Sequence, residues 1–194
     1  MRIAYTIENG KIEVRDSDFG DNGKEYLRIF NLCDPTISIF HVKGQIRNKS
    51  YSVFDAAPEQ GILLSVQVMP ENNRFEFESF NSFSVSYAPV IKSIQLMAAD
   101  TGFKYSYDSG VINRFDIYIP AGKVNELIPE SLLAQLHKDK IVNLSSLTED
   151  YPKTNSSLNK LLKRLEKPKS KSLCAHLESF IQSVTVDPVS AKLT

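Results

Sequence analysis

The fold of this chain is decided by residues 73–120, which read NRFEFESFNSFSVSYAPVIKSIQLMAADTGFKYSYDSGVINRFDIYIP. Aromatic and β-branched side chains recur at every second position, as in Phe103, Tyr105 and Tyr107. Successive residues of a strand point to opposite faces of a sheet, so this spacing places rings on one face and polar groups on the other. The stretch therefore predicts several β-strands with an apolar face that needs a covering layer.

The residues that precede this stretch continue the β pattern. Apolar residues alternate with polar ones on both sides of Asn9 and Gly10, a pair that accepts the positive φ angles of a type I′ hairpin turn. Short apolar runs with turn residues at intervals of roughly 8–12 residues are typical of antiparallel sandwiches and barrels. We expect a mainly β (α+β) fold, in which residues 1–122 form an antiparallel, sandwich-like or barrel-like β domain.

After residue 122 the apolar period becomes helical. Four leucines recur at the i, i+3, i+4, i+7 spacing of an amphipathic helix: Leu158, Leu161, Leu162 and Leu165. The polar segment 145–155 contains Pro152 and predicts a linker. We expect residues 123–186 to form a short helical C-terminal arm, with a basic amphipathic helix near 156–167 and a loose tail over 187–194.

The charge of the chain is unevenly distributed, although its formal net charge is zero. Residues 151–172 contain seven lysines and arginines against the single acid Glu166, a net charge of +6, so the remaining residues carry −6. A whole-molecule attraction to nucleic acid or membrane is therefore not expected, whereas a local one through this segment is.

The cysteine count and the hydropathy pattern predict a setting for the protein. The two cysteines, Cys33 and Cys174, are far apart and lack metal-ligand spacing, which favours a reduced, intracellular environment. The first residues lack the apolar run of a signal peptide, and no window has the roughly 18 apolar residues of a membrane span. We expect a soluble, cytoplasmic protein.

The patterns of known catalytic and cofactor sites fail when they are tested against the sequence. Neither Gly-Lys pair has the spacing of a phosphate-binding P-loop, and no G-x-S-x-G nucleophile elbow occurs. The acidic loop 16–25 lacks the glycine and glutamate of an EF-hand, so it indicates a solvated turn, with a calcium site as the alternative. His41 is expected to be a partly buried histidine with one neighbour, with a catalytic role as the alternative. We predict no enzyme activity, no cofactor and no metal.

The basic helix is the main candidate for an interaction site. Such a helix lies on an anionic membrane, follows a phosphate backbone, docks by its leucines into a protein groove, or covers a sheet of its own domain. A second candidate is a tyrosine pair whose hydroxyls suit an interface rim. The predicted interaction residues are Lys160, Lys163, Arg164, Lys167, Leu158, Leu161, Leu162, Leu165, Tyr105 and Tyr107.

We interpret the chain as a non-catalytic binding or assembly protein whose arm contacts a protein partner or a second copy, with viral or phage-type structural and accessory proteins as examples. One alternative is a binder of nucleic acid or an anionic membrane surface through residues 151–172. A second alternative is an unrecognised enzyme or small-ligand carrier, with a pocket near His41 or the acidic loop.

Overall fold

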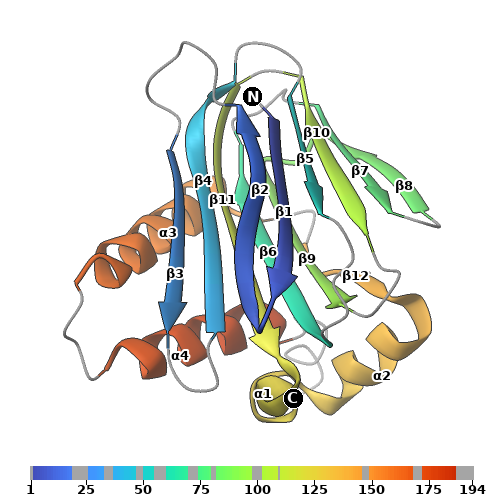
Figure 1. Ribbon diagram of the computed structural model, residues 1–194, viewed down its shortest axis with the longest axis vertical. Helices are drawn as coiled ribbons and strands as arrows, with labels where there is room; N and C mark the ends of the chain where they lie inside the picture. Colours follow the sequence, from blue (N-terminus) through green and yellow to red (C-terminus); the bar gives the residue numbers. More distant parts are fainter. Residues whose placement is uncertain are drawn as a thin grey trace.

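The computed structural model describes residues 2–18, 26–32, 37–46, 50–54, 60–69, 74–79, 82–97, 102–108, 110–145, 149–167 and 172–186. Two six-stranded sheets stack face to face, and helices cover the outer face of one of them (Figure 1). The predicted fold class, a mainly β antiparallel sandwich followed by C-terminal helices, is confirmed.

The strands of each sheet come from distant parts of the chain. The first sheet has the order β2 (Lys11–Asp18), β1 (Arg2–Glu8), β5 (Ser50–Phe54), β10 (Phe103–Tyr107), β7 (Phe75–Ser79) and β8 (Ser82–Ser86). The second has the order β12 (Ile141–Asn143), β9 (Val90–Met97), β6 (Gly61–Val68), β11 (Gly110–Pro120), β4 (Ile37–Ile46) and β3 (Tyr26–Leu32). The pairing of β1 with β5 is parallel, and the other pairings are antiparallel.

The predicted hairpin at the N-terminus is confirmed. β1 and β2 pair in antiparallel register, with Glu8 opposite Lys11. Asn9 and Gly10 have φ angles of 51° and 71°, the left-handed conformation that both central residues of a type I′ turn require.

The second sheet is buried on both faces, which is why its central strands carry long apolar runs. Alternate residues of β6, such as Leu64 and Val66, pack with the helices, whereas Leu63 packs between the two sheets. In β11 the residues 112–119 are all buried. The molecule therefore has two cores, one between the sheets and one between the second sheet and the helices.

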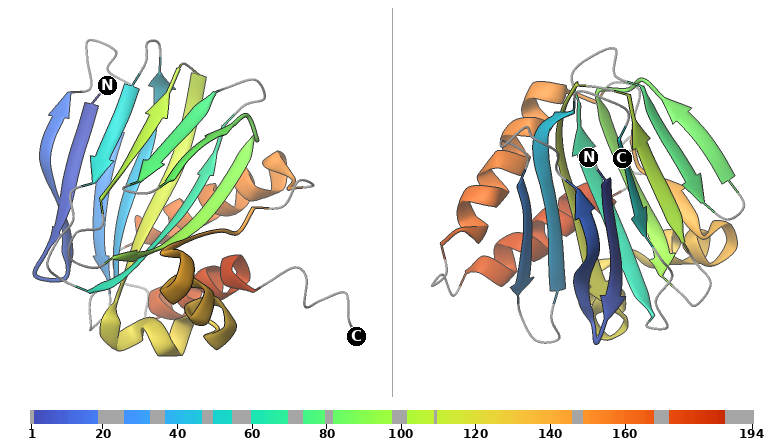
Figure 2. Two further views of the ribbon diagram at one scale, coloured as in Figure 1. Left: turned by 90° about the vertical axis from the view of Figure 1, so that its right-hand side faces the viewer. Right: turned by 45° about the horizontal axis from the view of Figure 1, so that its top comes forward.

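Four helices follow β11: α1 (Ala121–Leu127), α2 (Glu130–Asp139), α3 (Tyr151–Leu165) and α4 (Leu173–Thr185). Figure 2 shows α3 and α4 lying along the face of the second sheet that the first sheet does not cover. The leucines of α3 belong to the core between the second sheet and the helices, with exposed fractions between 0% and 8%.

The helix α3 begins earlier than predicted, so the linker predicted for 145–155 is wrong from Tyr151 onward. The Asp150 side chain accepts a hydrogen bond from the Lys153 backbone N–H and caps the helix. Pro152 lies in the first turn, where its missing N–H has no intrahelical partner to lose. The predicted tail 187–194 lies outside the described residues.

Two findings bear on the predicted setting. Within the described part of the chain, no helix has the length and apolar character needed to cross a membrane. Cys174 is disulfide-bonded, and the chain's other cysteine, Cys33, lies outside the described residues. Disulfides are rare in reducing compartments, so this bond removes the ground on which a reduced environment was predicted.

Candidate functional site

A cleft of about 650 Å³ lies between the two sheets at one side of the sandwich. On this side the first sheet ends with β7 and β8, and the second ends with β9 and β12 (Figure 1). The lining residues are Phe75, Phe77, Val85, Ser86, Tyr87, Ala88, Pro89, Val90, Ile91, Ser93, Tyr105, Ile141, Asn143, Ser145 and Glu149. The volume falls within the range of small-molecule sites in proteins, roughly 300–1,000 Å³.

One wall of the cleft is aromatic. Phe75 and Phe77 lie two residues apart on β7, and Tyr105 lies opposite Phe77 on β10, so all three rings share one face of the first sheet. The ring centroid of Tyr105 is 5.5 Å from that of Phe75 and 5.4 Å from that of Phe77. These separations are typical of packed aromatic pairs, so the wall is a closely packed apolar surface.

The opposite wall mixes apolar and polar side chains. Ile91 and Ser93 come from β9, and Ile141 and Asn143 come from β12. Ser93 is paired in register with Asn143 on one side and with Ser65 of β6 on the other. The Ser93 side chain makes no hydrogen bond to any residue in the described ranges, which leaves it a polar group available to a ligand.

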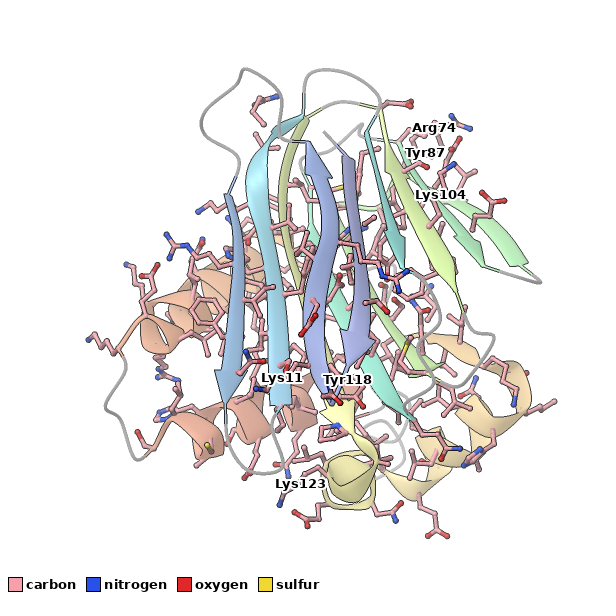
Figure 3. The ribbon with its side chains drawn as sticks, in the orientation of Figure 1. Lys11, Arg74, Tyr87, Lys104, Tyr118 and Lys123 are labelled. Atoms are coloured by element: carbon pink, nitrogen blue, oxygen red, sulfur yellow. The ribbon has the colours of Figure 1, made fainter. Side chains whose placement is uncertain are left out.

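The mouth of the cleft is partly polar. Tyr87, which is 61% exposed, directly follows β8 and lies at the upper right in Figure 3. Glu149 forms an ion pair with Lys92. The Ser145 hydroxyl accepts a hydrogen bond of 2.6 Å from the Lys92 backbone N–H. These contacts tie the segment that follows β12 to β9 and form the rim.

A buried ion pair lies behind the aromatic wall. Arg114 and Asp116, both on β11, are 0% exposed, and Arg114 Nε lies 3.2 Å from Asp116 Oδ2. Tyr5 donates a hydrogen bond of 2.9 Å to Asp116 Oδ2, and Ser65 donates one of 2.6 Å to Asp116 Oδ1. Partners of this kind are needed because an unpaired buried charge carries a large desolvation cost.

Tyr105 connects this network to the cleft. The Ser65 hydroxyl has one proton, which it donates to Asp116, so at 2.9 Å the Tyr105 hydroxyl is the donor to Ser65. Gln95 Nε2 in turn donates to the Tyr105 hydroxyl over 3.1 Å. Two hydrogen bonds with residues of the second sheet therefore hold the side chain of Tyr105, which belongs to the first sheet.

Tyr107 also connects the first sheet to the second. Its hydroxyl accepts a hydrogen bond of 2.6 Å from Arg114 Nη1 and donates one of 3.1 Å to Gln67 Oε1. The Arg114 guanidinium also lies 4.8 Å from the ring centroid of Tyr105 and 5.6 Å from that of Phe40. The network thus joins the two sheets beside the cleft and fixes their spacing there.

Burial controls the protonation of these groups. It is the largest cause that raises the pKa of Tyr5 and Tyr105 well above their ordinary value, and it raises the pKa of Tyr107 to about 12. Burial is the largest single influence on the pKa of Arg114 and would lower it, but Asp116 and the three buried tyrosines together raise that pKa. At neutral pH the tyrosines are therefore hydrogen-bond donors and the arginine is charged.

His41 lies on the other face of the second sheet, away from the cleft. It is buried, stacks on Phe115 with ring centroids 4.1 Å apart, and bonds Asn113 over 3.0 Å. His41 was expected to be partly buried beside one neighbour; it does bond a neighbour, Asn113, but it is fully buried. No group of three or more His, Cys, Asp and Glu side chains in the described ranges is arranged to hold a metal ion. Most of the acidic loop, residues 19–25, lies outside those ranges.

The predicted interface role of Tyr105 and Tyr107 is wrong. Both are buried, at 2% and 3% exposure, because their strand faces the second sheet. The predicted assembly role of the arm is also wrong, because the leucines of α3 (Leu158, Leu161, Leu162 and Leu165) are packed in the core and are not free to dock on a partner. The cations of the arm are exposed where described, and a binding role for them stays a prediction: Lys160, Lys163, Arg164 and Lys167.

Sequence reasoning missed the buried network, although a signal for it is present. Ser65 and Gln67 interrupt the apolar run of β6, and Arg114 and Asp116 interrupt that of β11, each pair at a spacing of two. Polar residues at that spacing within an apolar strand share one face, which predicts either a solvent-exposed face or a buried hydrogen-bond network.

Comparisons with known proteins leave the function open. No family model matches the chain, and no curated protein sequence matches it. Among the solved structures that resemble it, three illustrate how low the similarity is. The cupin domain of Schizosaccharomyces pombe Cnp3 has 7% identity and a TM-score of 0.33, covering 60% of this chain and 77% of that one.

The other two are similarly distant. A formate complex of Lactobacillus farciminis oxalate decarboxylase has 8% identity and a TM-score of 0.28, covering 67% of this chain and 47% of that one. PhpD with cadmium atoms has 9% identity and a TM-score of 0.29, covering 92% of this chain and 55% of that one. The chain thus spans about half the length of these two proteins. None of the three is described as a viral or assembly protein, and at these TM-scores the likeness carries no argument about function.

Proposed function

We propose that this protein binds a small, neutral, mainly apolar molecule in the cleft between β7–β8 and β9–β12. The observation that carries the proposal is the cleft itself, with its volume and its mainly apolar lining. Phe75, Phe77 and Tyr105 line an open hollow of about 650 Å³. These rings keep little exposed surface, so the other apolar residues of the lining supply most of the surface that a ligand would remove from water, and that burial favours binding by roughly 25 cal/mol per Å².

The charge of the lining favours a neutral ligand. Among the described lining residues, Glu149 is the side chain that is charged at neutral pH, and it is paired with Lys92. An anionic ligand would find no cation in this lining to offset its desolvation. A flat aromatic or alicyclic compound, which packs well against rings, suits the walls best.

The proposed role is binding without catalysis. A nucleophilic serine needs an adjacent general base to take its proton. Ser93 has no hydrogen-bond partner of that kind in the described ranges, and the one carboxylate of the lining is engaged with Lys92. These contacts support a carrier or a sensor rather than an enzyme.

The test uses the neutral, environment-sensitive fluorophore prodan, whose emission is easily read because the chain has no tryptophan. We expect saturable binding with a blue shift in emission. The variant Ser93→Phe fills the cleft with a ring and should weaken binding at least tenfold. The matched control is Ser156→Phe, which adds the same ring at an exposed position of α3.

Circular dichroism and thermal melts establish that both variants are folded. Prodan emission that does not saturate, or equal affinity of the Ser93→Phe variant and the unmodified protein, would refute the proposal.

A further inference from the structure

A row of polar side chains crosses the second sheet from the mouth of the cleft to the buried ion pair. Asn143 of β12 is paired with Ser93 of β9, Ser93 with Ser65 of β6, and Ser65 with Asp116 of β11. Residues paired in this way lie on the same face of a sheet, about 5 Å apart from strand to strand. The row therefore leads from solvent to the interior along the wall opposite the rings.

Most members of the row already have partners. Asn143 Oδ1 accepts a hydrogen bond of 3.0 Å from the Ser145 backbone N–H. Ser65 and Asp116 bond each other and the buried tyrosines. Ser93 is half-buried, and its hydroxyl has no hydrogen bond within the described ranges.

The remaining hydroxyls of the inner lining are also engaged. Ser86 Oγ accepts a hydrogen bond of 3.1 Å from the Ala88 backbone N–H. The Tyr105 hydroxyl bonds Ser65 and Gln95. Ser93 is therefore the half-buried serine of this lining whose hydroxyl makes no hydrogen bond within the described ranges.

A second polar atom lies close along the same strand face. Gln95 follows Ser93 by two residues on β9, which places the two side chains on one face, roughly 7 Å apart by strand rise. Gln95 is 0% exposed, and its Oε1 has no hydrogen-bond partner among the described residues. Gln95 itself is not among the residues that line the cleft, so Ser93 is the polar residue of this strand face that a ligand reaches.

We infer that the ligand carries a hydroxyl or amide N–H on the edge of its apolar body, and that Ser93 is the residue that selects for this group. This inference rests on the proposed function. The apolar body packs on the aromatic wall, while the donor group faces β9. Ser93 sets specificity, and the apolar lining supplies most of the affinity.

The experiment compares two compounds that differ in the donor alone, 2-naphthol and 2-methoxynaphthalene, in competition with prodan. For the unmodified protein we expect 2-naphthol to bind about tenfold more tightly, the value of one hydrogen bond to a partly buried partner. In the Ser93→Ala variant the affinities for the two compounds should differ by no more than about twofold.

Two matched variants separate specificity from affinity. Ser86→Ala removes a serine hydroxyl from the other wall and should leave the ratio unchanged. Phe77→Leu shrinks the aromatic wall and should weaken both compounds by a similar factor, again with the ratio unchanged.

The outcomes distinguish the two proposals. If the preference for 2-naphthol is absent in the unmodified protein, or persists in Ser93→Ala, the role of Ser93 is overturned while binding in the cleft stands. If prodan itself does not bind, the proposed function fails and this inference fails with it.

Discussion

Acidification should destabilise the folded protein through His41, because protonation places a charge on a buried ring. The ring of His41 stacks on Phe115, and its Nε2 donates a hydrogen bond to Asn113 Oδ1. The Asn113 amide nitrogen then donates to Asn155 Oδ1 of α3 over 3.1 Å. The pKa of His41 is lowered from 6.5 to about 4, chiefly by burial and to a smaller extent by the charges of Arg28 and other cations, whereas the Asn113 bond acts in the opposite direction.

The direction of the pH effect on stability follows from the pKa of His41 in the unfolded and in the folded chain. In the unfolded chain His41 takes up a proton near pH 6.5, whereas in the folded protein it does so only near pH 4. The contribution to stability is therefore fully present above pH 6.5 and is lost as the pH falls toward 4. The two pKa values differ by about 2.5, which at about 1.4 kcal/mol per pKa unit corresponds to about 3.5 kcal/mol in total and about 2 kcal/mol at pH 5.

The assay is urea unfolding at pH 7.5 and at pH 5, a range chosen because most carboxylates remain ionised in it. The unmodified protein should lose about 2 kcal/mol more of its free energy of unfolding than the His41→Gln variant does. The matched control is His137→Gln, which removes an exposed histidine near the end of α2 and should keep the pH dependence of the unmodified protein.

An NMR titration gives a direct second measurement, since the ring protons of His41 should shift with a midpoint near pH 4. Identical pH dependence in the unmodified protein and His41→Gln, or a midpoint near 6.5, would refute the reasoning.

Three further substitutions test the packing of the fold by urea unfolding. A Cβ added by Gly61→Ala would lie 2.7 Å from Cζ of Tyr118, so we expect the free energy of unfolding to fall by about 1–3 kcal/mol. A second substitution, Tyr118→Leu, should relieve this loss. An unchanged stability of Gly61→Ala would contradict the contact. Asp116→Asn leaves the charge of Arg114 buried without its counter-ion and should cost about 3–5 kcal/mol, whereas the double replacement Arg114→Met, Asp116→Leu should cost less; equal costs would show that the charge is solvated. Leu158→Ala creates a cavity between α3 and the second sheet and should cost about 2–5 kcal/mol, and a loss below about 0.5 kcal/mol would mean that α3 is not docked.

The candidate site was poorly predictable for a specific reason. The sequence pattern placed Tyr105 on an aromatic face of a strand. The residue that bonds its hydroxyl, Ser65, is 40 residues away in the chain, so the pattern could not identify it. Alternation shows which side chains share a face, yet it does not show which face of which strand they meet. The interface role assigned to Tyr105 and Tyr107 failed on that ambiguity, because a buried tyrosine and a rim tyrosine have the same pattern.

The sequence by itself determined the local elements of this protein. The turn at Asn9 and Gly10, the alternating strands and the leucine stripe of α3 follow from backbone sterics and from periodicities of two and 3.6 residues, which act between near neighbours. Only the tertiary structure decided that the stripe of α3 covers its own sheet, that Arg114 and Asp116 meet three tyrosines of the other sheet, and that the cleft beside Ser93 stays open. Strand order and the pairing of distant strands arise from burying all apolar faces at once, and that requirement is not contained in any single segment.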